Sequence, residues 1–323
     1  MTQIAIELPC PRRARFDRAD SPRPFQITER DVEIVRQVAG HRFLRSTHIS
    51  RLLDDGSHKK ILERLTVLYH AGYLDRPRAQ LEYHVRGGGS APLVYALGNC
   101  GAQLLIARDG LERVNLDWAR KNHQSGREFI LHTLAVADFR VALAVACRTR
   151  DNIFLRHPAQ LLATLPDETR ASRSPWGMRI RAPHQGAMHE IAVLPDYVFA
   201  LHFADGKRRP FVVECDRGTM PIERSTLDQT SMLRKFLGYE AARQQRMHTA
   251  RYGWQNFRVL IVAPTVERAD NMRAVLTRTP QLKASPLFLF TDHPALIQSS
   301  DMLKHQWLDA NGASTSLISG IRM

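Results

Sequence analysis

The stretch PDYVFALHFADGKRRPFVVECDRGT, residues 195–219, predicts two apolar strands joined by a polar turn. Both alternating faces of the first strand are apolar, which is typical of a central strand that is covered on both sides. The second strand has the same character up to Glu214. Carboxylates nevertheless stand at Asp196, Glu214 and Asp216. These acids indicate a functional or architectural centre in the hairpin.

The register of the hairpin decides whether the acids meet. If the turn pairs Leu201 with Arg209, counting back along the strands places Asp196 opposite Glu214. A slip of one residue would place Asp196 opposite Cys215 instead. Because side chains alternate along a strand, residues 214 and 216 share a face. The three carboxylates are therefore expected to converge in a dry environment.

Carboxylates in such a place need a positive partner. One ionised acid buried alone costs several kcal/mol, and two acids side by side raise each other's pKa. A divalent cation removes both penalties, and Mg²⁺ or Mn²⁺ held by oxygen ligands could activate water for phosphodiester hydrolysis. The alternative is an architectural network in which an arginine pairs with the acids. The candidates are Arg208, Arg217 and Arg234.

The composition indicates a polyanionic partner. The chain has 46 Lys and Arg against 32 Asp and Glu, a net charge of +14. Proteins this basic typically bind DNA or RNA, although charge can also serve solubility alone. The four cysteines are far apart, which argues against a structural zinc site. Without a signal-peptide pattern, or an apolar run near the roughly 18 residues of a membrane helix, we expect a cytoplasmic protein with no membrane partner.

Patterning divides the chain into four segments. Residues 1–25 are rich in Arg and Pro and predict a mobile basic arm. Residues 26–108 predict three helices, a strand, a Gly-rich tip and a returning strand, the order of a winged helix-turn-helix. Residues 109–126 lose apolar periodicity and predict a linker. Residues 127–323 predict helix, hairpin, helix, strand, helix, strand, hence an α+β or α/β mixed sheet flanked by helices.

Capping residues bound the predicted helices of the first domain. Thr28 should cap the first helix, Ser46 or Thr47 the second and Ser57 the third, which Gly72 ends. In a winged helix the third helix enters the major groove with its first turn nearest the bases. The residues expected to face DNA are Ser57, His58, Lys59, Lys60 and Arg64 on this helix, and Arg86 on the wing. A winged helix used for protein contacts stays an open alternative, as does a homodimer.

The second domain resembles the PD-(D/E)XK nuclease superfamily. Its PDYVF matches the first motif at Asp196, and VVECD matches the second at Glu214. Asp216 stands where the superfamily has its lysine. The resemblance implies a metal-dependent endonuclease in which Lys235 of the next helix replaces that lysine and Glu128 of the preceding helix adds a metal ligand. The plainer alternatives are a surface lysine and an acid that complements the helix dipole.

A closer resemblance, over roughly residues 27–245, is to the replication-relaxation family. It rests on AGYLDR, VYALGNCGAQLL, HTLAVADF, PDYVF, VVECDRGT and KFLGYE in that order. In that family Asp216 would be a regular feature of the second strand. The resemblance implies a DNA-associated protein of mobile genetic elements, in plasmid replication control or mobilisation. Its partners would be duplex DNA and replication or relaxase proteins.

Two functions from different classes follow. In the first, the protein is a non-catalytic DNA-binding factor, whose winged helix reads a site while the second domain grips DNA backbone or a partner protein. In the second, it is an endonuclease: Asp196, Glu214 and Asp216 form the catalytic centre, Glu128 completes the metal ligands and Lys235 acts on water. The absent motif lysine favours the first function, and the survival of a costly acidic cluster favours the second. Residues 296–323 predict no more than a strand or short helix.

Overall fold

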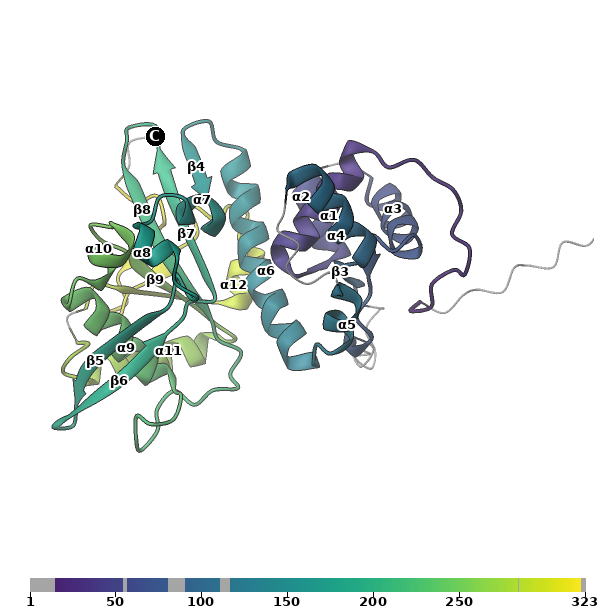
Figure 1. The fold of residues 1–323 in the computed structure, drawn as a ribbon. Coiled ribbons are helices and arrows are strands. Elements are labelled where there is room, and N and C mark those ends of the chain that lie inside the picture. Colours follow the sequence, from purple (N-terminus) through teal and green to yellow (C-terminus); the bar gives the residue numbers. More distant parts are fainter. Residues whose placement is uncertain (1–14, 55–56, 81–90, 111–116, 284, 321–323) are drawn as a thin grey trace, which may run out of the picture. The chain divides into compact units, whose positions relative to one another are not determined.

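The computed structural model describes residues 15–54, 57–80, 91–110, 117–283 and 285–320 (Figure 1). The chain divides into two compact units, residues 1–137 and 138–323. The division lies inside the long helix α6 (Arg127–Arg148), whereas we expected the second domain to begin at residue 127. The reason is packing: Ile130 and Leu134, in the first half of α6, join the core of the first unit.

The first unit is a small helical domain with a short antiparallel sheet. Its described strands pair in the order β1-β3-β2. The elements are α1 (Glu29–His41), β1 (Phe43–Arg45), α2 (Ser46–Leu53), α3 (His58–His70), β2 (Leu74–Asp75), a 3₁₀ turn (Arg78–Gln80), β3 (Val94–Leu97), α4 (Asn99–Asp109) and α5 (Trp118–His123). The described elements keep the predicted order of three helices and two later strands, with β1 as an additional strand. Most of the predicted Gly-rich tip lies outside the described residues.

Two of the three predicted helix caps are confirmed. Thr28 and Asp31 form a capping box at the start of α1, and the Ser57 side chain accepts a hydrogen bond from the backbone of Lys60 at the start of α3. The prediction for α2 was wrong, because the helix already includes Ser46 and its N-cap is Arg45. The cause is β1, whose pairing with β3 holds the backbone extended up to residue 45.

The N-terminal segment is more ordered than its composition suggested. We expected a mobile arm over residues 1–25, of which residues 1–14 lie outside the described residues. In residues 15–25, the guanidinium of Arg18 donates to the carbonyls of Tyr69 and Leu74 and pairs with Asp75 at 3.1 Å. The ring of Phe25 packs edge-on against Tyr73. This segment is therefore bound to α3 and β2.

The second unit is built on a mixed sheet. Within the described residues, seven strands form one sheet in the order β12-β11-β10-β9-β8-β7-β4. The strands are β4 (Ile153–Arg156), β7 (Tyr197–Phe203), β8 (Arg208–Cys215), β9 (Arg258–Ala263), β10 (Phe288–Asp292), β11 (Trp307–Leu308) and β12 (Ser314–Thr315). Strands β8, β9 and β10 are parallel, and the other neighbours are antiparallel. The α+β class and the flanking helices are as predicted.

Helices cover both faces of this sheet. On one face α9 (Met232–Gln244) and α11 (Val266–Arg278) pack on the strands, with Phe236 against Phe288 and Phe290. On the other face Phe139 of α6 contacts Phe199 and Trp307. The short helices are α7 (Pro158–Leu162), α8 (Asp167–Arg170), α10 (Met247–Tyr252) and α12 (His293–Gln298).

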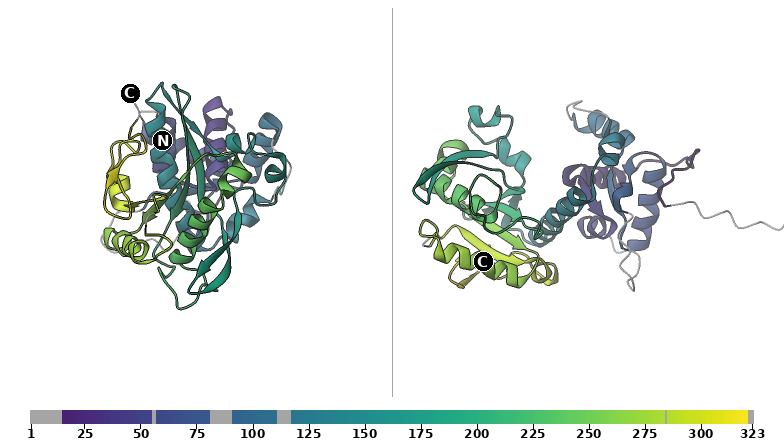
Figure 2. Two further views of the ribbon diagram at one scale, coloured as in Figure 1. Left: turned by 90° about the vertical axis from the view of Figure 1, so that its left-hand side faces the viewer. Right: turned by 90° about the horizontal axis from the view of Figure 1, so that it is seen from below.

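A separate two-stranded ribbon lies along α9 (Figures 1 and 2). Its strands are β5 (Met178–His184) and β6 (Ala187–Val193), which pair antiparallel along their whole length. The two turn residues, Gln185 and Gly186, both have positive φ, as a two-residue hairpin turn that follows the strand twist requires.

The helix α6 is long and apolar enough to cross a membrane by length and composition, and half of its most apolar stretch is buried inside the protein. From the sequence we expected no such run. Phe139, Val141 and Leu143 have no exposed surface at all. A core helix of a soluble protein passes the same test, and the burial supports that interpretation of α6.

Candidate functional site

The predicted register of the central hairpin is confirmed. Leu201 lies opposite Arg209 and Tyr197 opposite Val213. One further step along the strands places Asp196 opposite Glu214. The backbone N–H of Asp196 donates to the carbonyl of Val213 at 3.0 Å, and the carboxylate of Asp196 accepts from the N–H of Cys215 at 2.8 Å. Asp196 therefore fastens the start of β7 to the end of β8.

Glu214 is the buried centre of the acidic cluster. Its side chain is 2% exposed, near the carboxyl end of β8. One carboxylate oxygen accepts from Lys235 Nζ at 2.6 Å, and the other accepts from the hydroxyl of Tyr239. Residues 235 and 239 are one turn apart on α9, so both side chains point toward the strand beneath. The lysine that the sequence analysis selected does reach the acids.

The electrostatics of the cluster follow from burial. Burial raises the pKa of Glu214 to about 7, although the ammonium group of Lys235 opposes the shift. Burial works against the charge of Lys235, but the carboxylates of Glu214 and Asp196 outweigh it, so the pKa of Lys235 is raised. Asp216 also raises the pKa of Lys235. The four residues predicted for the catalytic centre thus lie within electrostatic reach of one another.

Asp216 has its own cationic partner. Both its carboxylate oxygens accept from the guanidinium of Arg268, which also donates to the carbonyl of Met220. Arg268 stands in the first turn of α11, which Thr265 caps. The side chain of Asp216 is 3% exposed, so this is a buried ion pair. An architectural network is therefore present, with an arginine other than the three that the sequence analysis named.

The acids do not fit a divalent cation in this arrangement. Both oxygens of Glu214 and both of Asp216 already accept from cationic or hydroxyl donors. Among the described residues, no group of three or more His, Cys, Asp or Glu side chains is placed to hold a metal ion. Glu128, the third predicted ligand, is exposed in the first turn of α6, and this part of the helix belongs to the first unit. Lys235 and Arg268 supply the positive charge that we had expected from a metal ion.

The predicted DNA-facing residues divide into two groups. His58, Lys59 and Lys60 are three consecutive exposed residues in the first turn of α3. No ion pair joins either lysine to another residue of the described chain. Ser57 is their helix cap, and the ring of His58 is hydrogen bonded to Ser50 of α2 at 2.7 Å. These residues form the exposed basic first turn of α3.

Arg64 has a structural role in the same unit. Its guanidinium pairs with the carboxylate of Asp31, a residue with no exposed surface. The same guanidinium donates to the carbonyl of Gln26 and lies over the ring of Phe25. Burial opposes the ionisation of Asp31, but hydrogen bonds from Arg64 and Thr28 outweigh it and lower the pKa of Asp31. The arginine therefore ties α3 to α1. Arg86 lies outside the described residues.

The chain matches one known protein family. The sequence model described as replication-relaxation matches residues 35–257. The chain belongs to the replication-relaxation family. The match runs from within α1 through the central hairpin to the residue before β9, so it includes both the basic turn of α3 and the acidic cluster. Membership points to a role in plasmid or mobile-element replication or relaxation. Comparisons with curated proteins and with solved structures gave no match.

One further acid, Asp138, lies near the acidic cluster of this replication-relaxation protein and was not predicted from the sequence. Asp138 of α6 is 7% exposed and hydrogen bonded to Nε2 of His293 at 3.0 Å. Burial raises the pKa of the Cys215 thiol, and Asp196, Glu214 and Asp138 raise it further, which places Asp138 near the end of β8. The signal was present in HTLAVADF, where a carboxylate interrupts an apolar helix just as others interrupt the hairpin.

Proposed function

We propose that this replication-relaxation protein is a non-catalytic, cytoplasmic DNA-binding factor of a mobile genetic element. In this proposal α3 docks in the major groove of duplex DNA, at a site that serves plasmid replication control or mobilisation. The observation that carries the proposal is the basic first turn of α3, with Lys59 and Lys60 exposed. The family membership supports the biological setting.

The local structure suits this role. Ile61, Leu65 and Leu68 bury one side of α3, so the opposite side and the first turn are presented to solvent. The major groove of B-DNA admits one α-helix, and a helix start offers N–H groups and favourable dipole charge to phosphate. Lysines without carboxylate partners can neutralise phosphates without first breaking an ion pair. Arg64 supports the helix from behind through Asp31.

The first prediction tests this contact. Replacing both lysines, Lys59→Ala with Lys60→Ala, should weaken binding to duplex DNA and reduce the slope of log K against log salt by about two units. The slope falls because each lysine releases about one counterion from the DNA. Fluorescence anisotropy with a labelled duplex over a salt series measures both quantities.

The matched control removes the same charge elsewhere. Lys283 and Lys304 are exposed lysines of the second unit, and the double variant Lys283→Ala with Lys304→Ala should keep the wild-type slope. If the two double variants lose the same affinity and slope, net charge alone explains binding and α3 is not the docking element.

A second candidate function, DNA cleavage, is favoured by one observation. Lys235 contacts Glu214 as a nuclease with a relocated lysine would require. The saturated carboxylates oppose it, because a metal would have to displace Lys235, Tyr239 or Arg268 before binding. We therefore give DNA binding precedence, with the second unit gripping DNA backbone or a replication or relaxase protein.

A cleavage assay separates the two candidates. Supercoiled plasmid incubated with the protein and Mn²⁺ or Mg²⁺ should stay intact, as it should with Glu214→Ala, because the cluster is built as an ion-pair network. Nicking by the wild type that disappears in both Glu214→Ala and Asp196→Ala would establish the endonuclease instead. Nicking that persists in both variants would come from a contaminant.

A further inference from the structure

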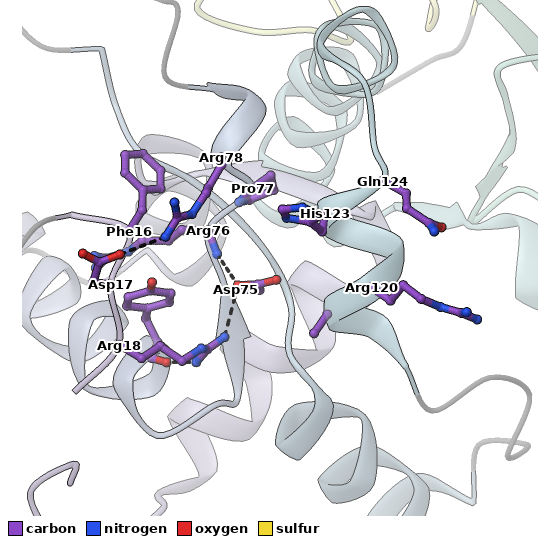
Figure 3. A pocket seen from close by; sticks show the side chains of 12 residues that line it. Phe16, Asp17, Arg18, Asp75, Arg76, Pro77, Arg78, Arg120, His123 and Gln124 are labelled. Atoms are coloured by element: carbon purple, nitrogen blue, oxygen red, sulfur yellow. Dashed lines mark hydrogen bonds and ion pairs between the residues drawn. The ribbon is translucent and has the colours of Figure 1, made fainter. Parts of the chain in front are cut away.

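A pocket of about 560 Å³ opens in the first unit, at the end of α3 away from its basic first turn (Figure 3). Its walls come from the N-terminal segment, the end of α3, the residues after β2, and α5. Its lining contains more cations than anions: Arg18, Arg76, Arg78 and Arg120 against Asp17 and Asp75. The ring of His123 lies beside them. The composition is that of an anion site.

Arg76 gives the pocket a buried charge. The residue is 8% exposed, and its guanidinium lies 4.1 Å from the ring centre of Tyr69 and 5.2 Å from that of Tyr95. It donates to the carbonyl of Arg15 and to the hydroxyls of Thr66 and Tyr95. None of these acceptors is a carboxylate, and within the part of the chain that the structure describes its Nε has no hydrogen-bond partner. Buried charges are normally paired, but among the described residues no carboxylate pairs with this guanidinium.

Asp75, the preceding residue in the chain, does not supply a counterion for Arg76 because its carboxylate has other partners. Asp75 pairs with Arg18 at 3.1 Å and accepts from the amide of Asn122 at 3.0 Å. It also stabilises the charge of Arg42, whose pKa is lowered by burial. One carboxylate therefore serves the guanidinium groups of both Arg18 and Arg42, and it also accepts from the backbone N–H of Arg76. A net positive charge remains at the inner side of the pocket.

The rim can adapt to a ligand. Arg78 pairs with Asp17 at 2.9 Å, and Arg120 with Asp117 at 3.5 Å, with all four side chains more than half exposed. Such pairs contribute about 0–1 kcal/mol, so a bound anion can replace the carboxylates. Figure 3 shows Arg76 and Arg78 on one side of the pocket and His123 on the side of α5, with Arg120 extending outward.

We propose that this pocket binds the phosphate groups of a nucleotide, either free or within a strand. Guanidinium groups match phosphate oxygens in pairs of hydrogen bonds, and the pocket has the volume of sites that hold molecules of nucleotide size. Phe16, half-buried in the wall, adds ring surface beside which the base or sugar can lie. The site goes beyond the proposed function, because it does not depend on docking of α3 in a groove.

The test titrates the full chain by calorimetry with three probes: ADP, inorganic pyrophosphate and adenosine. ADP and pyrophosphate should bind, and adenosine, which lacks phosphate, should not. The double variant Arg78→Ala with Arg120→Ala should lower the affinity for ADP by about tenfold or more, the effect of losing charge-assisted hydrogen bonds.

A closely matched control is available. Arg108 forms an exposed pair with Glu29, as Arg78 does with Asp17, and Arg170 pairs with Asp167 three residues earlier, as Arg120 does with Asp117. The double variant Arg108→Ala with Arg170→Ala should keep wild-type affinity for ADP. Equal losses in the two double variants, or no binding of ADP and pyrophosphate to the wild type, would overturn the proposal.

Two further arms identify the source of the phosphate. If duplex DNA displaces ADP, the pocket holds a phosphate of the strand. If ADP and duplex bind together, the ligand is a free nucleotide. The variant Lys59→Ala with Lys60→Ala should lose duplex binding and keep ADP binding. The variant Arg78→Ala with Arg120→Ala should lose ADP binding. The proposed function and the pocket proposal can therefore fail independently.

Discussion

At the scale of single residues, the carboxyl group of Glu214 links the fold to pH. Its pKa in the folded protein is about 7, above the ordinary value of 4.5, because burial disfavours the charged form. Between these two values the folded state holds a proton that the unfolded state releases. The contribution of this residue to stability is therefore complete below about pH 4.5 and is lost as the pH rises through 7.

The variant Glu214→Gln should remove this dependence. Its amide stays neutral and keeps a hydrogen bond acceptor for Tyr239 or Lys235. We expect the free energy of unfolding of the wild type, relative to the variant, to fall by about 3 kcal/mol between roughly pH 4.5 and pH 8. Urea denaturation across this range measures the difference. Parallel profiles for the two proteins would contradict a raised pKa at this position.

The acids of the cluster could be predicted from the sequence, but the arginine that pairs with one of them could not. Asp196, Glu214 and Asp216 stood out because carboxylates are unexpected in strands that are apolar on both faces. Their partner Arg268 could not be found in this way, because it is 52 residues from Asp216 along the chain and only the parallel pairing of β8 and β9 brings it close. An arginine in the first turn of an amphipathic helix has an ordinary local pattern.

At the scale of elements, local chemistry defined the helices. The helix predicted between the last two strands is α11, Val266–Arg278, in which Thr265 caps the start and the apolar residues recur at helical spacing. The short strand β1 was not predicted. Three residues cannot show the alternation by which a strand is recognised, and β1 depends on its partner β3.

Packing between elements explains a glycine that the sequence left without a role. Gly238 lies inside α9, where glycine costs about 1 kcal/mol relative to alanine. A Cβ atom at this position would be 2.7 Å from Val193 and 2.8 Å from Ile191 of β6. The ribbon of β5 and β6 can therefore lie directly on the backbone of α9, on the same helix that carries Lys235 and Tyr239 over Glu214. Such contact between elements has no local signature.

At the scale of the whole molecule, the positive charge belongs to both units. Residues 1–137 contain 21 Lys and Arg against 15 Asp and Glu, and residues 138–323 contain 25 against 17, so the net charges are +6 and +8. The sequence could predict two parts from the loss of periodicity before residue 127. It could not predict that α6 belongs to both cores, because apolar residues recur in both halves of the helix.

This distribution leads to a last prediction, on the salt dependence of DNA binding by the full chain. If the second unit also grips the DNA backbone, the double variant of Lys59 and Lys60 should keep a clear residual slope, since those lysines account for about two units. Arg179 and Arg181 are exposed on the outward face of β5, whose alternate residues are buried toward α9.

Adding Arg179→Ala with Arg181→Ala to that variant should lower the residual slope again, by up to about two units, while the melting temperature stays near that of the parent. The melting temperature should hold because neither side chain is buried. A slope that is already close to zero without Lys59 and Lys60 would mean that α3 alone holds the DNA, and the second unit would then be left to contact a protein partner.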